Sequence, residues 1–325
     1  MATVEVTFLH SQLEERKQRL QAALAGAPAN TGLAQLLREV DSALQRMDKG
    51  TYGLCEECHE SVEKDRLLAD PLVRYCLDHL TGEQRQALQR DLDLASQVQR
   101  KLLPESGLRA GGWETAYHYA PVGPVSGDYC DLIPTNGHLF FVLGDVSGKG
   151  VAASMLMTQL HALFRGLASM ALPLAQIVAQ ANRIFCDSAL AGLYATLVCG
   201  QAGPNGEVEI HNAGHWPAVV VGRGGTLRVE STGLPLGMFH NAEFAATRVQ
   251  LAPGDTLFLY TDGLSEARDP NGSEYGVERV TRLARQQASH APHESIAAFL
   301  ADLRAFSGSA SQLDDLALLA IRRSP

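Results

Sequence analysis

The sequence predicts an α+β fold preceded by a mainly helical N-terminal module. From Trp113 onward, the chain contains short strand-like runs bounded by Gly, Pro, Asn or Asp. These runs are WETAYHYAP, HLFFVLGD, LYATLVCG, EVEIHNA, PAVVVG, TLRVES, TLFLYTD and the final LALLAIRR. Helical stretches come in pairs, at about 150–170 and 174–190 and again near 276–305. Paired helices among more numerous strands favour an α+β domain over a regular βαβ repeat.

The composition is that of a globular protein, with 46% hydrophobic and 19% charged residues over 325 positions. The net charge of -9 argues against binding to nucleic acid, because phosphate contacts require a basic surface. The N-terminus becomes charged before the apolar core of a secretory signal could form. No apolar run approaches the roughly 18 residues that span a bilayer. We therefore expect a cytoplasmic protein without a membrane segment or a direct nucleic-acid partner.

Two N-terminal helices joined by a short turn are expected to form a hairpin. The first helix carries apolar residues on one side, at Leu9, Leu13, Leu20 and Leu24. A break follows at 26–30, which contains Gly and Pro. The second helix carries a heptad seam formed by Leu33, Leu37, Val40, Leu44 and Met47. The two apolar stripes predict an antiparallel pair of helices that bury their leucines against each other.

A tetrahedral zinc site is expected directly after this hairpin. The pair Cys55 and Cys58 has CxxC spacing, which lets two thiolates face one ion, and seventeen residues separate it from a second pair, Cys76 and His79. Three sulfur ligands and one nitrogen ligand complete the closed shell of a structural zinc ion. His59 competes with His79 for the fourth position, but the ligand spacing favours His79.

The zinc segment resembles the DksA/TraR-type zinc finger. The resemblance is carried by GTYGLCEEC, RLLADP and the closing CLDH, in which His79 stands where the family usually has a cysteine. A helical hairpin precedes the finger in that family, so the likeness covers residues 1–80. The acidic hairpin tip that such proteins insert into RNA polymerase is missing from LAGAPANTG. The resemblance therefore implies a regulatory docking or sensing module rather than a polymerase-binding protein.

A linker helix is predicted over 82–103, within a connecting segment that spans 81–106. Its thin apolar stripe consists of Leu88, Leu92, Ala95, Val98 and Leu102, and Pro104 ends it. Such a stripe suits pairing with a second helix, as in a homodimer. It suits a helix that lies on its own domain equally well.

The stretch LGDVSGKG at 143–150 looks like a phosphate-binding loop but lacks its defining spacing. A P-loop needs four residues between its first glycine and its Gly-Lys pair, followed by Ser or Thr. Here Gly144 and Gly148 are separated by three residues, and Gly150 stands where the hydroxyl should be. The remaining chemical group is Asp145, at the point where an apolar strand ends in a glycine-rich turn.

Other aspartates stand in comparable places along the chain. Asp128 follows a glycine, Asp262 follows an apolar run, and the pair Asp314 and Asp315 precedes the last predicted strand. Taken singly, each is explained by the frequency of Asp in turns. Brought together, such carboxylates would repel one another unless cations lay between them, and oxygen ligands favour Mg²⁺ or Mn²⁺.

Jointly, these stretches resemble the RsbU/SpoIIE-type branch of the PPM metal-dependent protein phosphatases. The matching pieces are SGDYCD, GDVSGKGVAASM, YATLVCG, NAGHWPAVVV, GLPLGM, LYTDGLSEARD and QLDDLALLAI. They occur in family order across about 107–323, and the connector LASQVQRKLLPE also resembles the segment before such domains. The resemblance implies a β-sandwich flanked by helices over 107–325.

The resemblance also implies the site residues. It implies two Mn²⁺ or Mg²⁺ ions that are bridged by Asp145 and assisted by the backbone carbonyl of Val146. Asp128, Asp262 and Asp314 would complete the catalytic set, with Asp315 in support. Family chemistry uses a metal-activated water, so no nucleophilic serine or cysteine is needed.

Four further side chains have more than one possible role. His215, in NAGHWP, matches a family histidine that is either structural or a proton donor. Lys149 either attracts phosphate or is a solvated turn residue. Arg165 and Arg268 are candidates for the arginine that binds phosphate. Ala317 stands where the last motif of the family usually has a threonine, with one residue between it and the aspartate pair.

The sequence thus predicts a metal-dependent serine/threonine phosphatase controlled by its N-terminal zinc module. By family analogy, the substrate is a phosphorylated STAS-domain anti-sigma antagonist. The alternative is a transcription-associated zinc-finger binding protein in which the phosphatase domain is a scaffold. The intact carboxylate set and the missing acids of the hairpin tip argue against this alternative.

Overall fold

The computed structural model describes residues 3–26, 30–80, 82–135, 137–170, 172–188 and 192–325. The chain divides into two compact units, Met1–Asp91 and Leu92–Pro325. The boundary falls inside helix α4 (Gly82–Leu102), so this helix begins in one unit and ends in the other. The division of the chain into a regulatory part, a linker and a phosphatase part stays a prediction.

The first unit contains the predicted helical hairpin, formed by α1 (Thr3–Gly26) and α2 (Thr31–Asp48). The side chain of Asn30 caps α2 by accepting a hydrogen bond from the Leu33 amide at 3.1 Å. The most buried residues of both helices share one apolar cluster with the zinc-finger segment, among them Leu9, Leu13, Val40 and Leu44. The predicted turn at 26–30 falls largely on residues 27–29, which lie outside the described residues.

Short elements follow the hairpin. They are α3 (Lys64–Ala69) and the 3₁₀ helix η1 (Leu77–His79), after which α4 begins. The buried Cys55 and Cys76 belong to the same apolar cluster as the hairpin. The finger and the hairpin therefore share one core within this unit.

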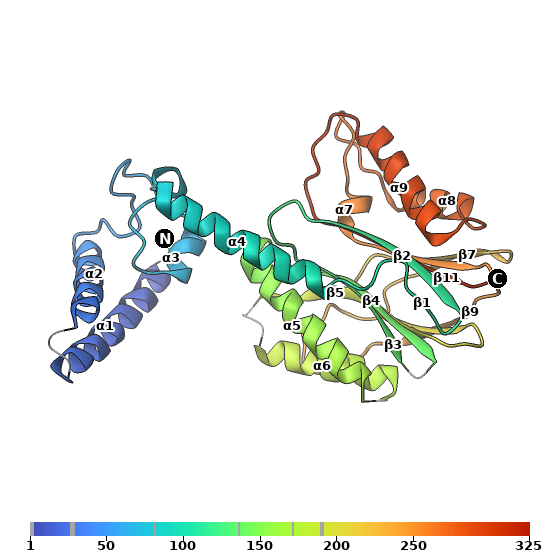
Figure 1. Ribbon diagram of the computed structural model, residues 1–325, viewed down its shortest axis with the longest axis horizontal. Coiled ribbons are helices and arrows are strands. Elements are labelled where there is room, and N and C mark those ends of the chain that lie inside the picture. The colour runs from blue at the N-terminus through green and yellow to red at the C-terminus, as the bar shows by residue number, and fades with distance from the viewer. Residues whose placement is uncertain (1–2, 27–29, 81, 136, 171, 189–191) are drawn as a thin grey trace. The chain divides into compact units, whose positions relative to one another are not determined.

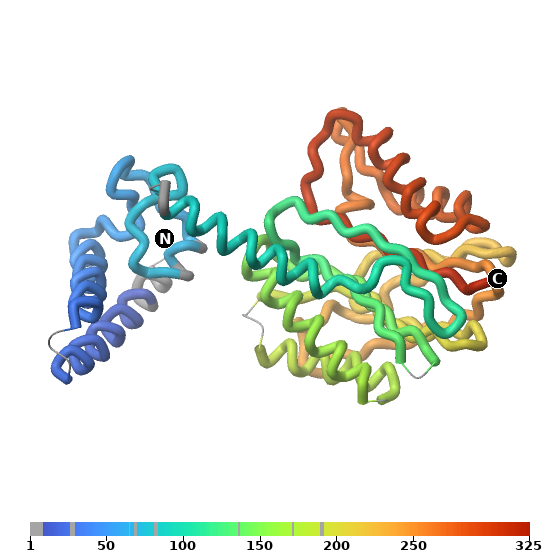
Figure 2. Tube along the Cα trace, viewed as in Figure 1, coloured from blue at the N-terminus to red at the C-terminus, as the bar shows by residue number. Residues whose placement is uncertain are grey.

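Two antiparallel sheets form the second unit. The six-stranded sheet has the order β1-β2-β11-β10-β7-β8 and the five-stranded sheet the order β3-β4-β5-β6-β9. The strands of the first sheet are β1 (Arg109–Ala110), β2 (Trp113–Ala120), β7 (Ala218–Gly222), β8 (Gly225–Val229), β10 (Thr256–Tyr260) and β11 (Leu316–Arg323). Those of the second are β3 (Asp128–Thr135), β4 (His138–Val146), β5 (Ala195–Ala202), β6 (Glu207–Ala213) and β9 (Ala246–Gln250). The last strand of the chain lies between β2 and β10, and the tube view follows it in red to the C-terminus (Figure 2).

The sheets pack face to face and are covered by helices on both outer sides (Figure 1). Side chains from both sheets, among them Phe141 and Leu319, share one fully buried cluster. The helices α5 (Gly150–Ala168) and α6 (Leu174–Ser188) pack on the five-stranded sheet. The helices α8 (Val277–Gln286) and α9 (Pro292–Ser307) pack on the six-stranded sheet. The predicted α+β class, with a sandwich flanked by helices, is confirmed.

Strand β3 is missing from the runs that the sequence pattern predicts. Its sequence DYCDLIPT contains Pro134 and two aspartates, which are depleted in strands. The strand forms because it lies at the edge of its sheet and pairs only with β4. Asp131 is buried there and accepts two hydrogen bonds from the Arg165 guanidinium, each of 2.8 Å.

None of the helices in the described ranges combines the length and the apolar character that crossing a membrane requires.

The shared core predicts a large effect of truncating Phe141. Changing Phe141 to Ala should lower the free energy of unfolding of the sandwich by about 3–5 kcal/mol, because a cavity replaces the ring between the sheets. Urea denaturation, followed by the fluorescence of Trp113 in the same cluster, measures this change. Phe239, which is 60% exposed, provides the control F239A. Equal stability of the two variants would contradict the shared core.

Candidate active site and metal centre

Asp128 and Asp145 lie opposite each other at the end of the β3–β4 pair. They are register partners in that ladder, and Asp145 is also paired with Thr196 of β5. Asp128 is almost fully buried, with 1% of its surface exposed, whereas Asp145 is half-buried. Two carboxylates from different parts of the sequence are therefore fixed side by side by sheet register alone.

The glycine-rich turn after Asp145 is shaped by its backbone. Gly148 and Gly150 have φ values of 96° and 73°, a region that glycine adopts readily. Ser147 fixes the turn, because its amide donates to the Tyr194 carbonyl and its hydroxyl accepts from the Tyr194 amide, both at 2.9 Å. The turn thus leads directly into α5, and Asp145 lies at the start of the turn.

Asp262 comes from the other sheet and begins the short helix α7 (Asp262–Ser265) directly after β10. A Cβ atom at the neighbouring Gly263 would lie 1.9 Å from the backbone oxygen of Asp315, so only glycine permits this close approach. The hydroxyl of Thr261 donates to Asp128 at 3.0 Å and accepts from the Ala317 amide at 2.9 Å. One threonine therefore joins the ends of β3, β10 and β11.

Asp314 and Asp315 have different surroundings. Asp314 is partly exposed and accepts a hydrogen bond from Lys149 at 2.8 Å. The Asp315 carboxylate accepts hydrogen bonds from the backbone amides of Val122 at 2.7 Å and Gly127 at 3.2 Å. Asp315 thus fixes the loop before β3 through two hydrogen bonds, while Asp314 lies at the partly exposed edge of the carboxylate site.

The electrostatics of the carboxylates show strong mutual repulsion. Burial, together with the charges of Asp145 and Asp315, raises the pKa of Asp128 well above its usual range. Burial, and then the charges of Asp262 and Asp314, raise the pKa of Asp145 to about 8. For Asp262, burial and the Asp314 charge raise the pKa to about 6. A bound cation would therefore be stabilised here, because it would offset the repulsion among these carboxylates.

The donor set fits hard divalent cations. The Oδ1 atom of Asp128 is buried and has no hydrogen-bond partner, so it is a carboxylate oxygen with its lone pairs unused. A Cβ atom at Gly127 would lie 3.0 Å from the Val146 carbonyl oxygen and 3.2 Å from the Asp145 Oδ1 atom. Carboxylate and carbonyl oxygens thus gather around a glycine, and such oxygens are what Mg²⁺ and Mn²⁺ prefer.

The aspartate oxygens are spaced more widely than the ligands of a single tetrahedral ion. Within the described ranges, only the cysteine and histidine group places three or more ligand atoms within 4.8 Å of one another. The two metal ions of a two-ion site lie about 3.5–4 Å apart, so ligands of different ions lie farther from each other than ligands of one ion. The wide spacing of the aspartate oxygens is therefore compatible with a two-ion site.

A cleft of about 380 Å³ opens beside these carboxylates. Asp145 and Asp262 line it together with Ser147, Tyr194, Thr196, Gly214, His215, Trp216 and Pro217. A second pocket, of about 490 Å³, has Asp314 and Arg268 among its lining residues. Asp145 and Asp262 are thus accessible from the first cleft and Asp314 from the second pocket, whereas Asp128 lines neither.

His215 has both ring nitrogens engaged. The Nε2 atom lies 3.1 Å from the Tyr260 carbonyl and must therefore carry the proton, and Nδ1 accepts from the Thr196 hydroxyl at 2.8 Å. Burial lowers the pKa of His215 to about 4. A neutral, fully bonded imidazole joins strands β5 and β10, which favours the structural interpretation of this residue.

The two arginine candidates differ in their contacts. The Nε atom and one Nη atom of Arg165 donate to the buried Asp131. Arg268 pairs with Glu274 at 3.1 Å and lines the pocket that contains Asp314. Only Arg268 of the two is thus placed beside the carboxylates.

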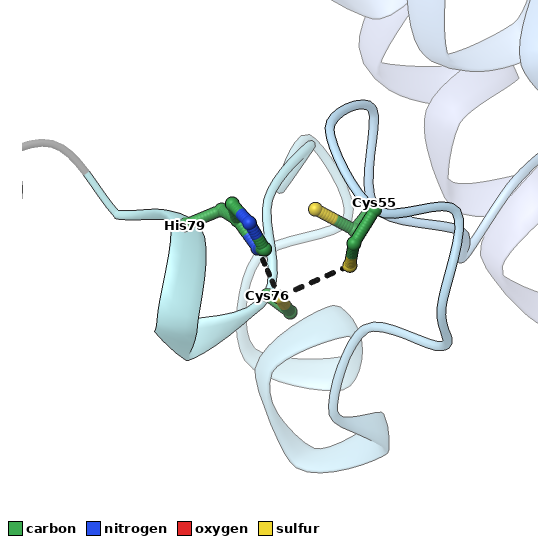
Figure 3. A group of neighbouring side chains, drawn as sticks. Cys55, Cys76 and His79 are labelled. Carbon is green, nitrogen blue, oxygen red and sulfur yellow. Dashed lines mark hydrogen bonds between the residues drawn. The ribbon is translucent and has the colours of Figure 1, made fainter.

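The predicted zinc ligands converge in the first unit (Figure 3). One ligand atom from each of Cys55, Cys58, Cys76 and His79 lies within 4.8 Å of the others. The Cys76 sulfur is 3.8 Å from the Cys58 sulfur and 3.2 Å from the His79 Nδ1 atom. Although burial opposes it, backbone amides such as that of Cys58 lower the pKa of Cys55 to about 6, which favours the thiolate that metals bind. The competitor His59 is an exposed turn residue with φ 58°.

Sequence reasoning missed Thr261. Its hydroxyl is the direct hydrogen-bond donor to Asp128, yet the sequence shows only a threonine between a buried strand and an aspartate. That position is a weak signal by itself, because the partner is 133 residues away.

Comparison with known proteins gives two family matches. Residues 135–324 match Stage II sporulation protein E (SpoIIE), and residues 50–78 match the prokaryotic dksA/traR C4-type zinc finger. Protein IcfG of Synechocystis sp. is 26% identical over 264 residues, which are 72% of this chain and 42% of IcfG. The phosphoserine phosphatase RsbU of Bacillus subtilis is 23% identical over 195 residues, which are 58% of this chain and 57% of RsbU. The chain thus spans about half the length of these relatives.

Solved structures share the fold of the second unit. The SiaA-PP2C domain of Pseudomonas aeruginosa superposes with a TM-score of 0.65 at 22% identity, covering 73% of this chain and 98% of that domain. The RsbU and RsbW domains of Rv1364c from Mycobacterium tuberculosis give a TM-score of 0.56 at 29% identity, covering 66% of this chain and 61% of that one. The SpoIIE model covers more than half of the chain. The resemblance found in the motifs is thereby confirmed, and this chain belongs to the SpoIIE family and carries a dksA/traR-type zinc finger.

Proposed function

We propose that this protein is a metal-dependent phosphatase that hydrolyses phosphoserine or phosphothreonine on a regulatory protein. The observation that carries the proposal is the convergence of Asp128, Asp145, Asp262 and Asp314 from both sheets, at a place where the pKa values of the first three are raised and Asp145 and Asp262 line an open cleft. RsbU is named a phosphoserine phosphatase, and so is RsbP of Bacillus subtilis, which is 27% identical over 193 residues; both names support the same reaction class.

The proposed metal ligands are the carboxylates and one carbonyl. Asp145 would bridge two Mn²⁺ or Mg²⁺ ions, and Asp128, Asp262, Asp314 and the carbonyl of Val146 would complete the set. The chemistry that such ions supply when bound is the deprotonation of a water nucleophile and the neutralisation of charge on the phosphoryl oxygens. Asp315 would act indirectly, because its carboxylate already accepts two backbone hydrogen bonds.

The protein's own contribution is orientation of the substrate. The cleft beside Asp145 is lined by Tyr194 and Trp216, which offer apolar surface to a peptide. Lys149, which is held against Asp314, presents positive charge near the reacting phosphate. Burial raises the pKa of the Cys130 thiol, so this residue is unsuited as a nucleophile. His215 positions β5 and β10 and does not serve as a proton donor.

For the substrate, we propose a phosphorylated STAS-domain anti-sigma antagonist in a partner-switching pathway. The support is the similarity to RsbU and RsbP and the likeness to a structure that joins RsbU and RsbW domains. The setting would be the cytoplasm. A transcription-associated zinc-finger protein is the alternative, favoured only by the dksA/traR match at residues 50–78.

The N-terminal module is proposed to hold one structural Zn²⁺ on Cys55, Cys58, Cys76 and His79 and to regulate the phosphatase. Pairing of α4 in a homodimer is part of this proposal. Leu88, Leu94 and Val98 of this helix are 40%, 60% and 53% exposed, so α4 retains apolar surface for a second helix.

Removing the bridging carboxylate tests the phosphatase proposal. The variant D145N should lose at least about 100-fold in kcat on a phosphoserine peptide with Mn²⁺, because loss of a direct ligand exceeds the effect of an outer partner. The control D187N changes an exposed aspartate of α6. If D145N and the parent chain cleave the peptide equally, the two-metal mechanism is wrong.

The raised carboxylate pKa values predict a pH-dependent affinity for Mn²⁺. Protons compete with cations for Asp145, whose pKa is about 8 in the metal-free protein, so Mn²⁺ should bind more weakly at pH 6 than at pH 8. Calorimetric titration in two buffers of different ionisation enthalpy measures both the affinity and the protons released. A pH-independent affinity without proton release would contradict this electrostatic picture.

Zinc analysis of the full chain tests the other centre. Elemental mass spectrometry should find about one zinc per chain, and C55S should remove it by deleting one of four ligands. The control C186S alters a cysteine of α6 outside the cluster. Undiminished zinc in C55S would exclude the proposed site.

A further inference from the structure

Gln99 is a buried polar residue near the end of α4. Only 6% of its surface is exposed, whereas Gln97 and Val98 on the same turn are exposed. Its side-chain Nε2 atom donates to the Ser126 carbonyl at 2.7 Å, and its Oε1 atom accepts from the Ser126 amide at 3.0 Å. Both backbone groups of Ser126 are thus satisfied by one glutamine, and all these residues belong to the second unit.

Ser126 begins the segment that builds the carboxylate site. The amide of Asp128 donates to the Ser126 hydroxyl at 3.0 Å. The amide of Gly127 donates to Asp315 at 3.2 Å, and its carbonyl accepts from the Val146 amide at 3.3 Å. Residues 126–128 therefore connect Gln99 with a proposed ligand, its supporting carboxylate and the loop that follows Asp145.

A glutamine suits this position for a chemical reason. The primary amide combines a donor and an acceptor on one planar group, so it pairs with both groups of a single peptide residue. Alanine would leave the buried amide and carbonyl of Ser126 unpaired. Glutamate would keep the acceptor but place a charge opposite the Ser126 carbonyl.

We propose that Gln99 is a positioning residue for the metal site. It holds residues 126–128 in the conformation in which Asp128 and the Val146 carbonyl bind cations, and it makes that conformation depend on the seating of α4. The inference rests on the proposed function, because it assigns Gln99 a role towards the same ions. Gln99 itself touches neither the ions nor the substrate.

The test compares Q99A and Q99E with Q97A, which changes an exposed glutamine of the same helix. Mn²⁺ binding to the full chain is measured by electron paramagnetic resonance of the free ion, and kcat and KM for a phosphoserine peptide are measured over a range of Mn²⁺ concentrations. We expect Q99A to bind Mn²⁺ about 10- to 100-fold more weakly, the usual effect of losing an outer partner of a ligand. Saturating Mn²⁺ should restore kcat, while the peptide KM stays unchanged. Q99E should fall between Q99A and the parent chain.

Thermal melting without added metal separates positioning from folding. A Q99A chain that melts like the parent but binds Mn²⁺ weakly supports the inference; if Q99A is unfolded, Q99E decides in the same way. Parental Mn²⁺ affinity in the folded Gln99 variants, or an equal loss in Q97A, would overturn it. A parent chain that takes up no Mn²⁺ would overturn the proposed function, and this inference with it.

Discussion

Repulsion among carboxylates is the constraint on which the rest of the second unit depends. Asp128 and Asp145 are placed side by side by the register of β3 and β4. Burial and the charge of Asp145 raise the pKa of Asp128, and burial and the charge of Asp262 raise the pKa of Asp145. Repulsion between neighbouring carboxylates would push them apart unless the rest of the structure held them rigidly in place. The two packed sheets provide that rigidity, and the Thr261 hydroxyl fastens one sheet to the other directly at Asp128.

The two proposed metal centres differ in the type of their ligands and in how far apart these ligands lie in the sequence. The zinc ligands are thiolates and an imidazole from a stretch of 25 residues, Cys55 to His79, and they converge within 4.8 Å. The carboxylates come from segments up to 187 residues apart, Asp128 to Asp315, and stay more widely spaced. The zinc ligands are brought together by a local segment with its own small core. The carboxylates are brought together only when both sheets of the sandwich have formed.

The contacts of α4 link the helix to this site through backbone groups. Gln99 bonds to Ser126, and the amide of Gly127 bonds to Asp315 across 188 residues of sequence. A displacement of α4 would therefore act on the proposed ligands through hydrogen bonds rather than through direct contact with the ions. The histidine of NAGHWP has a comparable supporting role, because its two nitrogens join β5 and β10.

The sequence by itself determined the α+β class, the paired helices, the zinc-ligand spacing and the order of the aspartates. These features are local, since they depend on periodicity, on turn residues or on CxxC spacing. Only the tertiary structure decided that the Pro134-containing segment is an edge strand, that His215 is neutral and fully bonded, and that Thr261 bonds to Asp128 and Gln99 to Ser126. The physical reason is that burial and hydrogen bonding between residues far apart in sequence set these properties, and neither is encoded in any short stretch of residues.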